Sequence, residues 1–180
     1  MTKVVVAAAL LALILAVGPA FAGSIGAWYV TVEKDPFSPK KKTIAISQSG
    51  YSALAIRCFP DHGLTVILAI RSEKHFEPGA SVDYKYRADE GPIADERGEA
   101  WGEQNIELPN ARQILDDALK ASVLNFRVGM ADEAIVDLAF KAKGGAKALQ
   151  QVVADCPPEP VADKKPEVPV DKKLEERTDK

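Results

Sequence analysis

Strict alternation of apolar and polar side chains is the feature that most limits how this chain can fold. Between residues 81 and 89, Val82, Tyr84, Tyr86 and Ala88 alternate with charged or hydroxyl side chains. A period of two places successive side chains on opposite faces of a β-strand. The segment therefore predicts a strand with one buried and one solvated face.

The same analysis predicts strands along most of the chain. Turn signals separate them: Ser49-Gly50 is typical of a tight hairpin turn, and 60–63 of a turn in which Pro presets the corner and Gly accepts positive φ. The segment 64–71 is apolar on both faces, which predicts a central strand. The other predicted strands cover residues 28–32, 43–47, 54–58, 101–108, 124–130 and 136–140.

Two helices are predicted late in the chain. Pro109-Asn110 opens the first, in which apolar residues recur on one face between 111 and 119; Gly144-Gly145 precede the second, which runs to Cys156. Residues 90–98, rich in acids, are predicted to form a surface loop. We expect an α+β fold that is mostly antiparallel β, a small sandwich or partly open barrel with two helices packed on it.

The N-terminal residues 1–22 predict a secretory signal peptide. Lys3 precedes an apolar run over 4–17, and Ala20-Phe21-Ala22 supplies the small-x-small site that precedes cleavage before Gly23. A helix over 4–17 would be about 21 Å long, shorter than the ~30 Å hydrocarbon core of a bilayer. We therefore expect a periplasmic or secreted protein with no transmembrane segment in the mature chain.

The predicted export bears on the state of the two cysteines. Cys58 and Cys156 lie about 100 residues apart, and outside the cytosol a lone pair of cysteines is most simply one disulfide. Strand alternation turns Cys58 inward, and the apolar stripe of the last helix does the same for Cys156. Residues 23–156 are thus predicted to form a single disulfide-bridged domain. Residues 157–180, rich in Pro, Lys and Glu, predict a disordered tail.

Charge and composition exclude several function classes. The 180 residues carry 23 Lys+Arg and 26 Asp+Glu, a formal net charge of -3, so we expect no nucleic-acid partner. His62 and His75 are each predicted to lie in a solvent-exposed turn or loop. No G-x-S-x-G motif marks a serine nucleophile, Ser72 near His75 included. We predict no catalytic residues, no metal site and no cofactor.

A few residues remain as candidate surface contacts. Trp28 and Tyr29 follow the cleavage site; they either contact a partner or plug one end of a small β-domain, and the plug is favoured. Lys40, Lys41 and Lys42 form the one basic run. It is typical of a guarded strand edge, and a weak contact with anionic lipid or glycan is the alternative.

Several segments resemble the VasI-like family associated with type VI secretion. They are residues 28–30, the strand 54–58, the strand end 86–89, the Phe140 strand and the terminal pattern that ends in Cys156. The resemblance implies a small exported bacterial protein with one disulfide and no established enzymatic activity. The helix entry from Phe140 to Gly145 departs from the family pattern, which puts a shared partner in doubt. A second resemblance is to the invasion-associated locus B family, whose further cysteines are absent here.

Three functional hypotheses follow. The first is a non-enzymatic exported envelope protein that acts as an accessory or binding module for another envelope protein. The second is a small secreted hydrolase of envelope glycan or peptide. The third is a secreted inhibitor of a partner enzyme, with the tail or residues 90–98 as its contact.

Overall fold

The computed structural model describes residues 23–34, 36, 41–59, 61–130 and 133–156. The predicted signal peptide, with Ala20 and Ala22, and the predicted tail lie outside these residues, and Gly23 begins the first strand. The described part contains these strands and helices: β1 (Gly23–Ile25), β2 (Trp28–Lys34), β3 (Lys41–Ser49), β4 (Ser52–Phe59), β5 (Gly63–Ala69), β6 (Ser81–Ala88), β7 (Ala94–Gly102), β8 (Asn105–Leu108), α1 (Ala111–Lys120), β9 (Val123–Gly129), β10 (Ile135–Lys141) and α2 (Ala146–Asp155).

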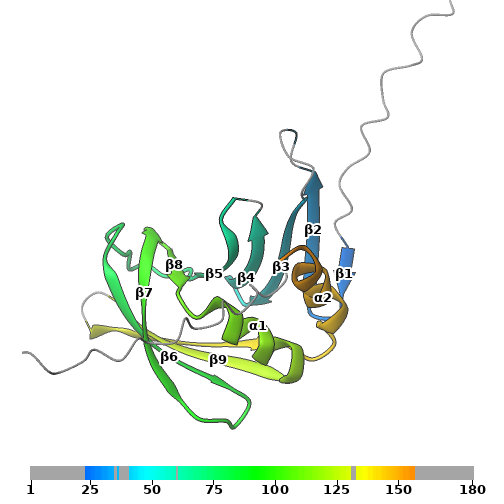
Figure 1. Ribbon diagram of the computed structural model, residues 1–180. Coiled ribbons are helices and arrows are strands. Elements are labelled where there is room, and N and C mark those ends of the chain that lie inside the picture. The colour runs from blue at the N-terminus through cyan, green and yellow to red at the C-terminus, as the bar shows by residue number, and fades with distance from the viewer. Residues whose placement is uncertain (1–22, 35, 37–40, 60, 131–132, 157–180) are drawn as a thin grey trace, which may run out of the picture.

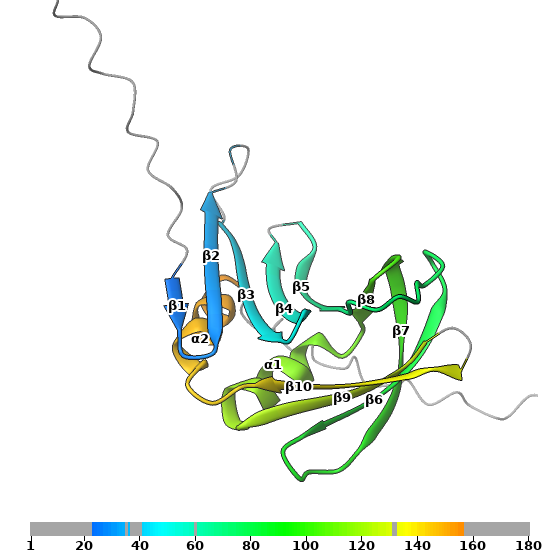
Figure 2. The same cartoon turned by 180° about the vertical axis from the view of Figure 1, so that it is seen from behind.

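The strands form one antiparallel sheet in the order β1-β2-β3-β4-β5-β8-β7-β6-β9-β10 (Figures 1 and 2). The segment predicted to be central is β5, which lies between β4 and β8. The sheet curls so that β10 comes beside β3, where the Ser47 hydroxyl donates to the Lys141 carbonyl at 3.2 Å. The predicted class, mostly antiparallel α+β with two helices, is confirmed.

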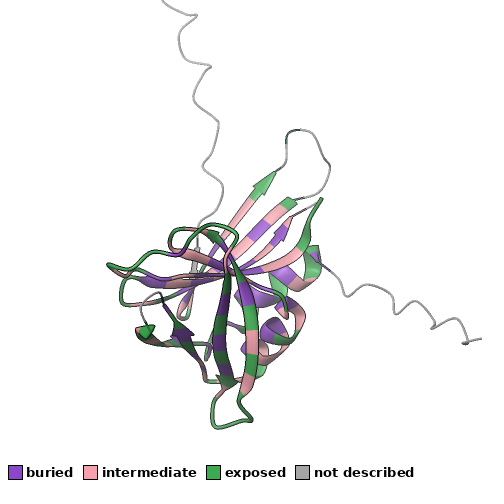
Figure 3. Cartoon of the chain, turned by 90° about the vertical axis from the view of Figure 1, so that its left-hand side faces the viewer, coloured by how far each residue is buried: buried purple, intermediate pink, exposed green. Residues whose placement is uncertain are grey.

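Burial alternates along the strands and gives the sheet an inner and an outer face (Figure 3). The inner face packs against both helices around one core. Tyr84 and Tyr86 on β6 point inward, and their hydroxyls donate to Asn110 at 2.7 Å and to Asp117 at 2.8 Å. These two hydrogen bonds attach α1 to the sheet, since Asp117 lies within that helix and Asn110 at its start.

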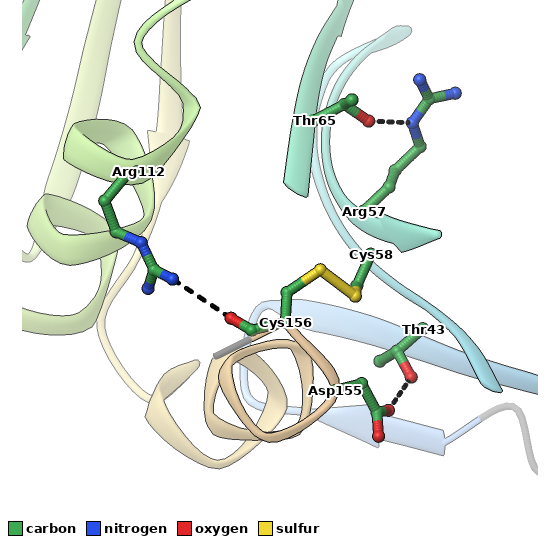
Figure 4. The surroundings of a disulfide bond; sticks show 7 residues. All are labelled: Thr43, Arg57, Cys58, Thr65, Arg112, Asp155 and Cys156. Atoms are coloured by element: carbon green, nitrogen blue, oxygen red, sulfur yellow. Dashed lines mark hydrogen bonds between the residues drawn. A yellow bond between two sulfur atoms is a disulfide. The ribbon is translucent and has the colours of Figure 1, made fainter. Parts of the chain in front are cut away.

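The second helix is attached by the Cys58–Cys156 disulfide (Figure 4). Both cysteines are buried, so the predicted bridge and the inward direction of both side chains are confirmed. Two further contacts surround it. Arg112 Nη2 on α1 donates to the Cys156 carbonyl at 3.1 Å, and the buried Thr43 hydroxyl on β3 donates to the Asp155 carboxylate.

On β3 the smaller side chains face the core. Thr43, Ala45 and Ser47 are fully buried, whereas Ile44 and Ile46 lie half-exposed on the outer face. The reason is α2, which packs on this strand and leaves room only for small side chains. Hydrophobicity along β3 is thus a poor guide to which face is buried.

The surface loop predicted over residues 90–98 is wrong, because β7 begins at Ala94 and forms a hairpin with β6. Two of its exposed charged side chains, Asp95 and Arg97, meet partners of opposite charge across the strand pair. Arg97 Nε lies 2.7 Å from Asp83, and Lys85 pairs with Asp95. The acidic composition therefore belongs to the solvated face of a strand, where opposite charges pair.

Candidate binding surface

The outer face of β2, β3, β4 and β5 carries an apolar row that no helix of the described chain covers. The register places Tyr29 opposite Ile46, Ile46 opposite Ala55, and Ala55 opposite Ile67. Tyr29 is 51% exposed, and Ile46 and Ala55 are partly exposed. A row of this kind on a sheet face is unusual unless a partner covers it.

A cation held between aromatic rings lies beside this row. The Arg57 guanidinium carbon is 5.0 Å from the centroid of the Phe59 ring and 5.2 Å from that of Trp101. Lys42 Nζ lies 5.8 Å from the same Phe59 ring. These are cation–π distances. We call Lys42, Arg57, Phe59 and Trp101 the Arg57 cluster.

The contact between Arg57 and Trp101 spans the sheet. Arg57 lies on β4 and Trp101 on β7, with β5 and β8 between them in the strand order. Ile67, on the outer face of β5, is only 5% exposed although it is not part of the main core cluster. The contact between Arg57 and Trp101 therefore crosses the outer face of β5 and β8, while Trp101 itself is 63% exposed.

Arg57 is an incompletely paired cation. Its Nε donates to the Thr65 hydroxyl at 3.1 Å, and Figure 4 shows both terminal nitrogens on the side away from Thr65. No carboxylate of the described residues forms an ion pair with it. Burial lowers the pKa of Arg57, and the charge of Glu107 opposes that shift.

A hollow of about 560 Å³ lies beside the exposed ring of Trp101. Glu99 and Glu107 line it from opposite positions on β7 and β8, together with Arg97 and Ser81. The edge of the Arg57 cluster is therefore mixed in charge, with acids close to the indole.

The other half of the outer face, on β6, β7, β9 and β10, has a different character. Arg127 and Asp137 form a bidentate ion pair here, at 2.7 and 2.9 Å. It lies on the same half as the ion pairs between β6 and β7 described above. A hollow of about 500 Å³ lies here, lined by Arg87, Arg127 and the exposed Ile93 among others. Most of its charges are already neutralised by neighbours, so this half offers less to a ligand than the Arg57 cluster.

The candidate contacts from the sequence divide between the two faces. Trp28 as a surface contact is wrong: it is fully buried, because it lies on the inner face opposite the small Ser47 and packs against Gly145. Tyr29 does lie on the outer face. Lys41 is exposed, Lys42 belongs to the Arg57 cluster, and Lys40 lies outside the described residues.

The two histidines lie in separate loops. His62 occupies the exposed turn before β5, and His75 Nδ1 lies 3.9 Å from Glu103 in a solvated pair. Within the described part of the chain no three His, Cys, Asp or Glu side chains group as metal ligands would.

Arg57, Phe59 and Trp101 were not among the surface residues predicted from the sequence. A signal existed for two of them, because an inward Cys58 turns its neighbours Arg57 and Phe59 outward. The approach of Trp101 had no such signal. It depends on the pairing of β5 with β8, which the local sequence does not encode.

Comparison with known proteins yields a fold but no family. No family model and no curated protein matches the sequence. The fold is similar to the crystal structure of invasion associated protein B from Bartonella henselae, with a TM-score of 0.53 and 14% identity, over 75% of this chain and 97% of that one. At this identity the likeness shows the fold alone. By name, that structure corresponds to the second of the two families considered in the sequence analysis, and no family model supports the VasI-like resemblance.

The two helices of the described residues have ten residues each, and neither has the length or apolar character needed to cross a membrane.

Proposed function

We propose that this protein is an exported, non-enzymatic binding module of a bacterial envelope, which recognises a partner protein through the outer face of β2–β5. The observation that carries the proposal is the Arg57 cluster beside the uncovered apolar row. Arginine and exposed aromatic rings are the side chains enriched at the centres of protein interfaces. Ile67, opposite Ala55 on the same face, is only 5% exposed, so the apolar row includes a well-packed side chain.

Three observations support the exported setting. Residues 1–22 have the order of a cleaved signal peptide, and the first strand begins at Gly23, directly after the predicted site. The domain contains a disulfide, a bond that persists in oxidising compartments. The fold is also similar to that of a protein named for association with invasion. We further propose a distant kinship with the invasion-associated locus B family.

Export is tested by N-terminal sequencing of the protein recovered from periplasm or medium. The expected sequence begins at Gly23. A membrane-bound species that retains residues 1–22 would contradict the exported, soluble form.

Partner recognition is tested by a photo-crosslinking amino acid placed on either half of the outer face in the native cells. Position 46 lies in the apolar row, and position 87 on β6 is the matched control, since both are outward-facing strand positions. We expect a discrete protein adduct from position 46 and none from position 87. Equal adducts from both, or none from position 46, would contradict the proposed surface. The identity of the adduct would separate an accessory module from an inhibitor of an enzyme.

A further inference from the structure

Two aromatic rings lie close to the Arg57 guanidinium, whose terminal edge is free of hydrogen-bond partners. Its central carbon is 5.0 Å from the Phe59 ring centroid and 5.2 Å from that of Trp101, and its Nε donates to Thr65 at 3.1 Å. The terminal nitrogens have no hydrogen-bond partner among the described residues and lie on the side away from Thr65 (Figure 4). A half-buried cation of this kind is stabilised by a nearby counter-charge. Glu107 acts on it through its charge but forms no ion pair with it, so the terminal nitrogens can still bind a second carboxylate.

The geometry of the free edge determines which counter-charge fits. Two terminal N–H groups in a fixed plane match the two oxygens of a carboxylate and bind them in parallel. The neighbouring rings of Phe59 and Trp101 suit the methylene groups that carry such a carboxylate. An acidic side chain within an apolar segment meets both requirements.

We propose that the Arg57 cluster binds the carboxylate of an acidic side chain on the partner protein, while flanking apolar side chains of that partner lie along Tyr29, Ile46 and Ala55. This inference rests on the proposed function and names the chemistry that the outer face recognises. It assigns Arg57 as the residue that distinguishes an acidic partner segment from a neutral one.

The charge pattern of the face favours a single carboxylate over an extended anion. Glu33 is opposite Lys42 in the register, and Glu107 and Glu99 flank the far end of the cluster. An anionic bilayer or polyanion laid across the face would meet these acids, and their repulsion would oppose binding. A single carboxylate bound at Arg57 meets fewer of these acids than an extended anion would, and among them Glu107 is the one whose charge acts on Arg57.

The test uses the mature chain and two synthetic pentapeptide amides, acetyl-Val-Leu-Glu-Leu-Val and the same peptide with Gln in place of Glu. Binding is followed by the emission of Trp101, since it is 63% exposed whereas Trp28 is fully buried. We expect a saturable change with the Glu peptide at millimolar concentration and affinity about tenfold weaker for the Gln peptide. In a third arm, vesicles of phosphatidylcholine with phosphatidylglycerol replace the peptides and test an anionic bilayer as the ligand.

Arg57→Lys keeps the charge but removes the planar fork, and should weaken the Glu peptide by about tenfold. Arg87→Lys, on the charged half of the outer face, is the matched control and should bind as the parent does. Circular dichroism and the absence of free thiols establish that each variant is folded and bridged.

Each remaining result has a definite consequence. Equal affinity for the Glu and Gln peptides, no saturable response to the Glu peptide, an unchanged affinity in Arg57→Lys, or binding of the vesicles in place of the peptide would each overturn the inference. If position 46 still crosslinks to a partner when Arg57→Lys is without effect, the proposed function stands and only the assignment of Arg57 fails. If the Glu peptide binds through Arg57 but no partner is crosslinked, the proposed function fails instead.

Discussion

The indole of Trp28 lies directly against the backbone of Gly145: a Cβ atom added at position 145 would stand 2.1 Å from its Cδ1 and 2.3 Å from its Nε1. The neighbouring turn is equally close, since a Cβ at Gly26 would lie 2.7 Å from the Gly144 carbonyl oxygen. The β1–β2 hairpin therefore packs onto the entry to α2 at backbone contact. Close packing accounts for glycine at position 145, whereas Gly144 has a φ of 85°, which favours glycine.

Gly145→Ala should lower the free energy of unfolding by about 1–3 kcal/mol, the usual cost of overpacking a core. The φ of -83° at Gly145 is open to alanine, so the loss would come from the clash with Trp28 and not from backbone strain. Chemical denaturation measures it. Gly129→Ala is the control, because the nearest atom to its Cβ would be the Asp83 carbonyl oxygen at an ordinary 3.6 Å. Equal stability of the two variants would contradict the packing described here.

The sequence predicted those parts of the fold that depend on local periodicity. Residues 81–88 form the expected strand, and both helices bury the stripe that their spacing indicated. The hairpin over residues 90–98 was missed because the first half of its second strand carries consecutive charged residues, Asp95, Glu96 and Arg97, instead of an apolar alternation. Only the register with β6 shows that Asp83 lies opposite Arg97 and Lys85 opposite Asp95.

The candidate surface was harder to predict than the fold. For Trp28 and Tyr29 a plug in the domain was favoured over a surface contact, which fits the buried Trp28 but not the exposed Tyr29. Adjacent aromatic residues do not reveal which of them faces the core. Arg57 could be assigned outward from Cys58. Its stacking with Trp101 depends on a long-range strand order that no local pattern contains.

The packing of α2 on β3 gives a second prediction. Ala45 is fully buried beneath the helix, so Ala45→Leu should lower the free energy of unfolding by about 1–3 kcal/mol. Ala53→Leu, on the half-exposed outer face of β4, should change it by no more than about 0.5 kcal/mol. Thermal or chemical unfolding compares the two. A larger loss at position 53 than at position 45 would mean that the faces of the sheet are assigned the wrong way round.

Stability should fall in alkali because of the two inward tyrosines. Burial raises the pKa of Tyr84 and of Tyr86 far above the ordinary value of 10, and for Tyr86 the hydrogen bond to Asp117 adds to the shift. Above pH 10 the unfolded chain loses these protons while the folded chain keeps them. The free energy of unfolding should therefore decrease by about 1.4 kcal/mol per pH unit for each tyrosine.

The comparison of variants isolates this effect from other groups that titrate in alkali. In Tyr86→Phe the free energy of unfolding should fall less steeply between pH 10 and pH 11.5, by the slope that corresponds to one proton. The loss of the hydrogen bond to Asp117 lowers stability at neutral pH but does not change this comparison of slopes. Tyr51→Phe, at a position 85% exposed, is the control and should leave the slope unchanged. Identical slopes in all three proteins would show that Tyr86 is not held neutral by the fold.

The disulfide gives the last prediction. Cys58 and Cys156 are 98 residues apart in the sequence, so their bond closes most of the domain into one loop and limits the unfolded chain strongly. For a loop of this length the chain-entropy model gives about 4–5 kcal/mol, and native disulfides of small secreted domains contribute about 2–5 kcal/mol. Cys58→Ala and Cys156→Ala should each lower the free energy of unfolding within that range. The double variant should be no less stable than either single variant, since all three lose the same bond.

Arg112→Gln, which removes the guanidinium that donates to the Cys156 carbonyl, should have a smaller effect because the disulfide itself remains. Thiol titration of the denatured, unreduced parent protein should find no free thiol. Two free thiols per exported chain would refute the bridge, and additive losses in the double variant would mean that each cysteine stabilises the domain by packing alone.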